Sequence, residues 1–131
     1  MVFVSPAQVQ ASSPVIITDV SPETPQLIAD EASRQQLTAT DTYLLQSIAY
    51  CESHDQQFNA SGTVYRGEVD PDDVGIFQLN EHYQQKTALS LGLDIEKTLD
   101  NIHYAVLLYR WRGVVSWTAS KKCWSQTPPH W

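Results

Sequence analysis

The chain has 131 residues, 42% of them hydrophobic, which is enough for one buried core but too short for two independent domains. Its 8 basic and 15 acidic residues give a net charge of −7, so we expect no nucleic-acid partner, because the charge repels phosphate. No apolar run reaches the roughly 18 residues that cross a bilayer, and no basic amphipathic stretch indicates membrane-surface binding.

Residues 1–24 are predicted to be an extended linker or N-terminal arm, and residues 25–131 the folded domain. The first segment contains Pro6, Pro14 and Pro22 among scattered Ser, Thr and Ala, a composition typical of linkers. It lacks the basic start and continuous apolar region of a signal peptide, so we expect no export signal in this chain.

The first half of the folded part is predicted to contain two helices and an irregular segment. Apolar residues at helical spacing indicate a helix over 25–36 and a core helix over 41–53, which Thr40 or Asp41 can cap. Residues 57–73 combine glycine and proline with the β-prone string TVYR, which predicts a small irregular hairpin or loop that lines a cleft.

The second half is predicted to be helical. A helix over 81–91 can be capped by Asn80, and another over 100–112 should stop at Gly113. The string SWTASKKCW (116–124) indicates a short helix, followed by a frayed end. The predicted class is therefore mainly α with a minor β element.

Glu52 is the most informative polar residue in the chain. It lies four residues after Ile48 and seven after Leu45, so on a helix it falls on the apolar stripe. Burial disfavours the ionised form, and the negative end of the helix dipole acts in the same direction, so we predict a raised pKa. A carboxyl group that stays protonated near neutral pH can act as a general acid. Alternatively, Glu52 turns toward water at the helix end and pairs with a base.

A second informative string, DDVGIFQLN, follows at 72–80. It predicts close approach of another group to the backbone at Gly75, and hydrogen-bond partners for the Gln78 amide between two apolar residues. Sugars offer such partners, whereas a buried glutamine that caps a turn explains the pattern equally well.

Two cysteines, Cys51 and Cys123, are too few for a zinc site and too far apart for a redox pair. They form one disulfide or remain free thiols. A bridge would close a loop of about 70 residues, stabilise the fold by roughly 4 kcal/mol, and imply an oxidising compartment. The histidines show no metal-ligand spacing and no phosphate-binding glycine loop is present, so we expect no metal and no cofactor.

Five segments resemble, in order, the lysozyme superfamily. They are IAYCESHDQQFNA (48–60), DVGIFQLN (73–80), ALSLGLD (88–94), NIHYAVLLY (101–109) and SWTASKKCW (116–124). The chain is most similar to soluble lytic transglycosylase (SLT) domains and small bacterial lysozyme-like proteins, in which a Glu-Ser pair ends the catalytic helix and a Gly-apolar-apolar-Gln motif follows. The resemblance covers essentially the whole folded region and implies a lysozyme-like fold.

The resemblance also implies an activity and a set of site residues. Glu52 matches the acid that protonates the glycosidic oxygen between N-acetylmuramic acid and N-acetylglucosamine in peptidoglycan. Ser53 matches a serine that usually shapes the site, Gln78 a glutamine that holds the sugar, and Gly75 the glycine that allows its approach. The residues we expect at the substrate are Ser53, Gly75, Gln78, Asn80 and Tyr109. Trp117 and Trp124 are predicted to belong to the core.

Asp73 is the candidate second carboxylate, because animal C-type lysozymes carry an acidic residue in a similar position. Asp70 and Asp72 are nearby alternatives, although an acidic loop of this kind is often simply solvated. A retaining hydrolase uses the second carboxylate as nucleophile or charge stabiliser. A lytic transglycosylase needs only the acid, and the substrate's own groups complete the reaction with an anhydro product. The sequence leaves both open.

We therefore expect a monomeric muramidase or lytic transglycosylase that acts outside the cell or in the cell envelope, with the peptidoglycan glycan strand as its partner. One alternative is a module of the same fold that binds peptidoglycan without cleaving it. Another is an interaction domain whose acidic arm recruits a partner, with the motif residues kept for packing.

Overall fold

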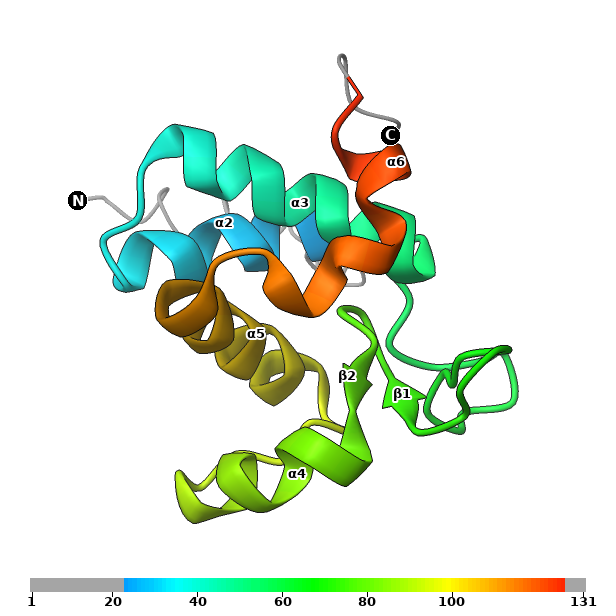
Figure 1. Cartoon of the computed structure of the whole chain (residues 1–131). Helices are drawn as coiled ribbons and strands as arrows, with labels where there is room; N and C mark the ends of the chain where they lie inside the picture. The colour runs from blue at the N-terminus through cyan, green and yellow to red at the C-terminus, as the bar shows by residue number, and fades with distance from the viewer. Residues whose placement is uncertain (1–22, 127–131) are drawn as a thin grey trace, which may run out of the picture.

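The computed structural model describes residues 23–126 and is mainly helical (Figure 1). Its elements are α2 (Thr24–Arg34), α3 (Ala39–Ser53), β1 (Asp73–Val74), β2 (Leu79–Asn80), α4 (Glu81–Ser90), α5 (Thr98–Arg112), the 3₁₀ helix η2 (Val115–Ser120) and α6 (Lys121–Trp124). The predicted class, mainly α with a minor β element, is confirmed. The predicted arm over 1–24 and the frayed end fall almost wholly outside the described residues.

Local capping sets where the helices begin. Pro25 lies in the first turn of α2, where a missing N–H is tolerated. Thr38, and not Thr40 or Asp41, is the N-cap of α3: its Oγ1 accepts from the Asp41 N–H at 3.1 Å, and Asp41 Oδ2 accepts from the Thr38 N–H at 3.1 Å. Asp41 thus completes a capping box from inside the helix, which moves the helix start two residues earlier than predicted.

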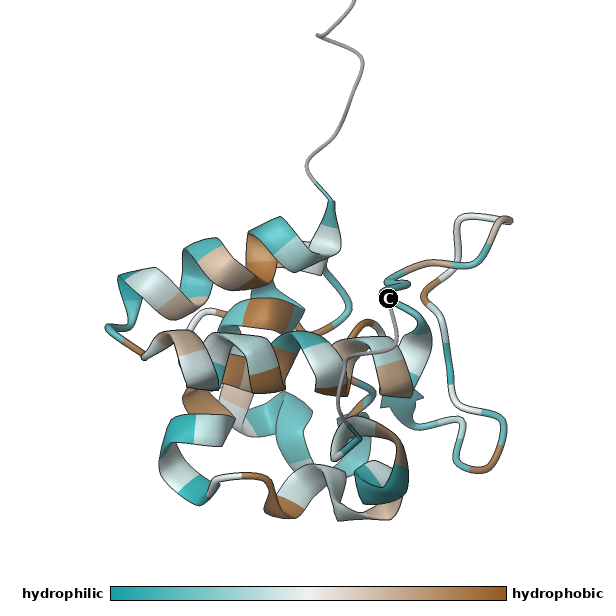
Figure 2. Cartoon of the chain, turned by 90° about the horizontal axis from the view of Figure 1, so that it is seen from above, coloured by the Kyte–Doolittle hydropathy of each residue, from teal (hydrophilic) through white to brown (hydrophobic). Residues whose placement is uncertain are grey.

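The helices pack around one core. Helix α2 packs on α3 and α5, and α3 also contacts η2 and α6. Figure 2 shows hydrophobic residues interspersed with hydrophilic ones along the helices. Leu45, Ile48 and Tyr104 are among the fully buried core residues. Within residues 23–126 no helix is both long and apolar enough to span a membrane.

The sheet lies in the DVGIFQLN string and not around TVYR as predicted. Strands β1 and β2 are antiparallel, with Asp73 opposite Asn80 and Val74 opposite Leu79. The TVYR region contributes only isolated bridges, such as that between Phe58 and Val64. The wall beside the hairpin is therefore mostly irregular loop, in agreement with the glycine and proline content of 57–73.

Two buried amides hold the turn of this hairpin. Asn101 Oδ1 accepts from the Phe77 N–H at 3.1 Å, and its Nδ2 donates to the Val74 carbonyl at 3.0 Å. Gln57 Oε1 accepts from the Ile76 N–H at 2.9 Å. These hydrogen bonds satisfy backbone groups that would otherwise be buried without a partner, so the turn is fixed against the helical core.

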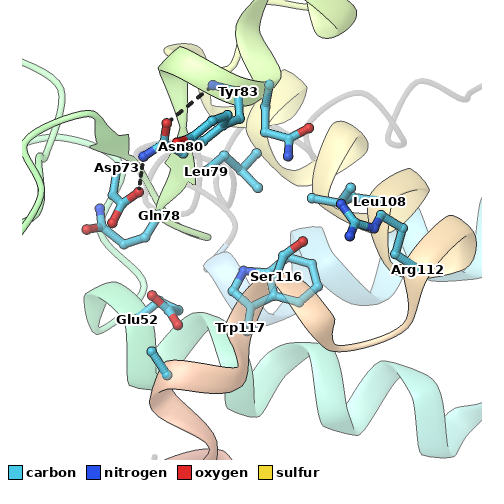
Figure 3. A pocket seen from close by; sticks show the side chains of 12 residues that line it. Glu52, Asp73, Gln78, Leu79, Asn80, Tyr83, Leu108, Arg112, Ser116 and Trp117 are labelled. Carbon is cyan, nitrogen blue, oxygen red and sulfur yellow. Dashed lines mark hydrogen bonds between the residues drawn. The ribbon is translucent and has the colours of Figure 1, made fainter.

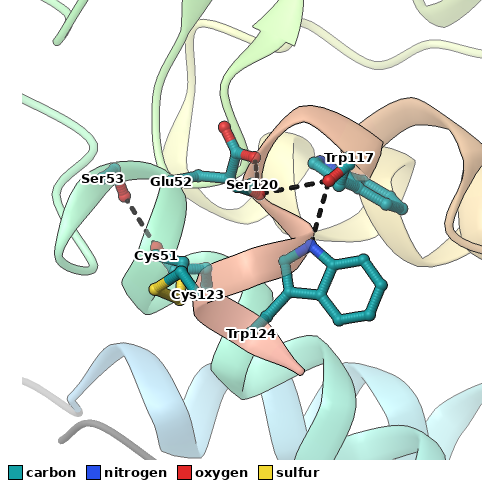
Figure 4. Close-up of a disulfide and its surroundings, with 8 residues drawn as sticks. Cys51, Glu52, Ser53, Trp117, Ser120, Cys123 and Trp124 are labelled. Atoms are coloured by element: carbon teal, nitrogen blue, oxygen red, sulfur yellow. Dashed lines mark hydrogen bonds between the residues drawn. A yellow bond between two sulfur atoms is a disulfide. The ribbon is translucent and has the colours of Figure 1, made fainter. Parts of the chain in front are cut away.

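The segment 116–124 is two short elements and not the single helix predicted. The two elements, η2 and α6, meet at Ser120, and η2 itself is kinked at Trp117, whose φ of −119° and ψ of 20° are not helical. Its buried indole donates to the Phe77 carbonyl at 2.9 Å, and Trp124 is also buried, so the predicted core role of both tryptophans is confirmed. A disulfide joins Cys51 to Cys123 and ties α6 to the end of α3 (Figure 4).

Candidate functional site

A cavity of about 490 Å³ opens between α3, the hairpin, α5 and η2 (Figure 3), within the range of 300 to 1,000 Å³ typical of ligand sites. It is lined by Glu52, Asp73, Gln78, Leu79, Asn80, Tyr83, Gln84, Leu108, Arg112, Ser116, Trp117 and Ala119. A second cavity of about 320 Å³ shares Glu52, Asp73 and Gln78 with the first. The two cavities are therefore adjacent, and we refer to them together as the groove.

Glu52 is partly buried near the end of α3, and its carboxyl group faces this groove. Burial raises its pKa from the ordinary value of 4.5 to about 7, and the negative charge of Asp73 adds to the rise. The Ser120 hydroxyl donates to Oε2 at 2.6 Å and acts in the opposite direction (Figure 4). The predicted rise in the pKa of Glu52 is confirmed, with burial as its main cause.

Asp73 faces the groove from β1, across from Glu52 (Figure 3). Burial is also the main cause that raises its pKa, while the hydrogen bond from Asn80 Nδ2, 2.9 Å from Oδ1, lowers it. The same Asn80 nitrogen donates to Asp70 at 3.0 Å, and Asp72 is exposed and lines neither cavity. Of the three predicted alternatives, Asp73 lines both cavities with Glu52, whereas Asp70 lines only the smaller one.

Gln78 and Asn80 both line the groove, as the sequence predicted. Gln78 has a φ of +49°, which is uncommon outside glycine and is typical of turns and functional sites. Its Nε2 donates to the Gly75 carbonyl at 3.1 Å, and its Oε1 lies against Gly67, where a Cβ would be 2.9 Å away. Asn80 caps α4 through a hydrogen bond from the Tyr83 N–H at 3.3 Å, as predicted.

Ser53 and Tyr109, which the sequence placed at the substrate, do not line the groove. Ser53 is buried, and its hydroxyl donates to the Ile76 carbonyl at 2.7 Å, so it joins the end of α3 to the hairpin turn. The Tyr109 hydroxyl donates to Asp41 at 2.6 Å and connects α5 to the start of α3. Both residues hold the scaffold of the site.

Gly75 also has a structural role, which differs from the one predicted. Its φ is +75°, and an added Cβ would collide with Gln57 Oε1 and lie 2.5 Å from Asn101 Nδ2. The close approach that the motif indicated is therefore to two buried amides and not to a sugar.

Sequence reasoning missed Ser120 and Asn101. Ser120 lies three residues before Cys123, and Glu52 directly follows Cys51, so the disulfide was a signal that these two could meet. Asn101 lies four residues before Ala105 on the buried side of a helix, the same kind of signal that singled out Glu52.

The polar side chains that line the larger cavity include the carboxyl groups of Glu52 and Asp73. Across residues 23–126 no group of three His, Cys, Asp or Glu side chains is arranged to hold a metal ion. The disulfide indicates an oxidising environment, such as that outside the cell.

No protein-family model, curated protein or solved structure matches this chain.

Proposed function

We propose that this chain has a lysozyme-like fold and cleaves the peptidoglycan glycan strand at the β-1,4 bond between N-acetylmuramic acid and N-acetylglucosamine, with Glu52 as the general acid. The observation that supports this most is a partly buried carboxyl group that borders an open groove and has a pKa of about 7. About half of such groups carry a proton at neutral pH, which suits a general acid.

The contacts of Glu52 suggest which oxygen carries the proton. Oε2 accepts the hydrogen bond from Ser120, so Oε1 is left to hold the proton that passes to the glycosidic oxygen. The C–O bond to the leaving sugar then breaks, positive charge develops on the remaining sugar ring, and Glu52 becomes a carboxylate.

Asp73 lines the same cavity as Glu52, so its carboxylate is a candidate to stabilise that positive charge. In a hydrolase, Asp73 acts as nucleophile or electrostatic stabiliser, and water completes the reaction. In a lytic transglycosylase, Glu52 alone is required, and the C6 hydroxyl of the muramic acid closes an anhydro ring. We propose that either reaction takes place in an oxidising compartment outside the cell or in the cell envelope.

Clearing of purified cell walls tests this proposal. The wild-type protein should lower turbidity, and Glu52→Gln should abolish clearing, because an amide N–H is too weak an acid to protonate the glycosidic oxygen. Glu23→Gln, which removes a carboxylate from the exposed start of α2, serves as the control and should clear like wild type. Equal clearing by the wild-type and Glu52→Gln proteins would remove Glu52 from the mechanism.

Two further readouts separate the remaining alternatives. Mass spectrometry of the products divides the enzymes, since reducing ends indicate hydrolysis and 1,6-anhydro ends indicate transglycosylation. Sedimentation with cell walls in the absence of any clearing by the wild-type protein would favour the non-catalytic binding module.

A further inference from the structure

Arg112 is the one cation among the residues that line the groove. It stands at the end of α5, and Figure 3 shows it across the cavity from Glu52 and Asp73, with Trp117 and Leu79 between them. Within residues 23–126 its guanidinium has no hydrogen bond or ion pair to another side chain. Five N–H donors are thus available to a ligand in the cavity.

A comparison with the neighbouring Arg110 shows that the helix dipole does not explain why the Arg112 side chain lines the cavity. Both arginines lie in the last turn of α5, where positive charge complements the helix dipole. Arg110 makes a long contact of 3.5 Å to Gln35 and does not line the groove, whereas Arg112 does. The dipole accounts for a basic residue in this turn but not for a basic side chain in the cavity.

We propose that Arg112 binds a carboxylate carried by the glycan and so makes the groove selective for muramic-acid-containing strands over neutral chitin-type strands. This inference rests on the proposed function, because it takes the groove to be the glycan site. N-acetylglucosamine is neutral, whereas N-acetylmuramic acid bears a lactyl group that ends in a carboxylate or continues into a peptide with carboxylates of its own.

Arg112 is the positively charged group in a groove that also contains carboxyl groups, so it determines where an anionic ligand can bind. Glu52 and Asp73 occupy the other side, and an ionised carboxylate there repels an anionic ligand. A guanidinium binds a carboxylate through two parallel N–H···O bonds, which fixes orientation as well as adding affinity. The anionic arm of the substrate is therefore directed to the α5 side, away from the acid.

The surroundings of Arg112 suit a sugar with such an arm. The exposed ring of Tyr83 and the hydroxyl of Ser116 line the same cavity, together with Gln84. The Gln84 Oε1 accepts from the Tyr104 hydroxyl at 2.7 Å, which holds the amide in place and leaves its N–H groups for a ligand. Neutral donors bind sugar hydroxyls, an aromatic face packs against the C–H face of a sugar ring, and Arg112 adds selection by charge.

Equilibrium binding to a protein that cannot turn over the ligand tests this assignment. Glu52→Gln protein is titrated with a peptide-free tetrasaccharide of alternating N-acetylglucosamine and N-acetylmuramic acid, with the same sugar carrying stem peptides, and with chitotetraose. Arg112→Gln should weaken binding of the muramic-acid ligands about tenfold, or about 1.4 kcal/mol, and leave chitotetraose binding unchanged. The difference should shrink at high salt, because Arg112 is exposed.

Arg110→Gln is the matched control and should change neither affinity. A loss confined to the peptide-free ligand identifies the lactyl carboxylate, and a loss confined to the peptide-bearing ligand identifies a peptide carboxylate; both support the proposal. Equal affinities for all ligands, or an equal loss for chitotetraose, would overturn the role of Arg112 while leaving the proposed function intact. No binding of any ligand, together with no clearing by the wild-type protein, would overturn both.

Discussion

The pKa of Glu52 predicts that this residue destabilises the fold above neutral pH, and that Glu52→Gln relieves the effect. The substitution keeps the size of the side chain and an oxygen that can accept from Ser120. It removes only the charge, whose burial is the main cause of the raised pKa. A trade of stability for activity at this position is expected of a catalytic group held in a poorly solvated site.

The magnitude follows from linkage. A rise in pKa from 4.5 to about 7 corresponds to roughly 3 kcal/mol, at about 1.4 kcal/mol per pH unit. Because the folded protein binds this proton more tightly than the unfolded chain, the contribution of Glu52 to stability is greatest below pH 4.5. It is lost as pH rises through about 7. The variant lacks this dependence and should be more stable by roughly 3 kcal/mol at pH 8.5.

Urea unfolding of both proteins at pH 4, 6, 7 and 8.5 measures the effect. All other titrating groups, Asp73 among them, are present in both proteins and largely cancel in the difference. The free-energy difference between variant and wild type should grow between pH 4.5 and 7.5 and then level off. A difference that does not change with pH would refute the reasoning, since it would mean that Glu52 titrates alike in the folded and unfolded chains.

Three other predictions follow from the contacts of the site. Ser120→Ala should move the alkaline limb of the pH–activity profile to higher pH, because its hydrogen bond lowers the pKa of Glu52; an unmoved limb would contradict this. Reduction of the disulfide, or Cys51→Ser with Cys123→Ser, should lower the free energy of unfolding by roughly 4 kcal/mol, because the bridge closes a loop between residues 72 positions apart. An unchanged melting temperature would show that closing this loop does not stabilise the fold. Tyr109→Phe should lower stability by about 1 kcal/mol, because it removes the hydrogen bond to Asp41, and should leave cell-wall clearing unchanged. A loss of clearing in the folded variant would show that the Tyr109 hydroxyl is needed for activity.

The sequence predicted best what depends on local periodicity. The helices, the burial of Glu52 and the direction of its pKa shift all follow from apolar residues at three- and four-residue spacing. The capping of α4 by Asn80 and the end of α5 at Gly113 are likewise local features. These predictions needed no knowledge of which segments meet in space.

Contacts between distant segments were beyond this kind of reasoning. The motif indicated that some group approaches Gly75 closely, but only the fold reveals that the side chain of Asn101 is one of the groups that do so. Asn101 also accepts a hydrogen bond from Phe77, which lies 24 residues earlier in the chain. Ser120 reaches Glu52 across 68 residues. Tyr109 was assigned from the resemblance, yet its hydroxyl stabilises the helix junction, because an aromatic residue has the same spacing whether it faces a groove or a neighbouring helix.

The most direct test of the central claim is an NMR titration of the Glu52 side-chain carboxyl carbon, labelled with ¹³C and assigned by comparison with Glu52→Gln. We predict a midpoint near pH 7, the value expected of a carboxyl group that retains its proton beside an open groove. A midpoint near the ordinary value of 4.5 would show that Glu52 is ionised at neutral pH, and it would contradict a role as general acid.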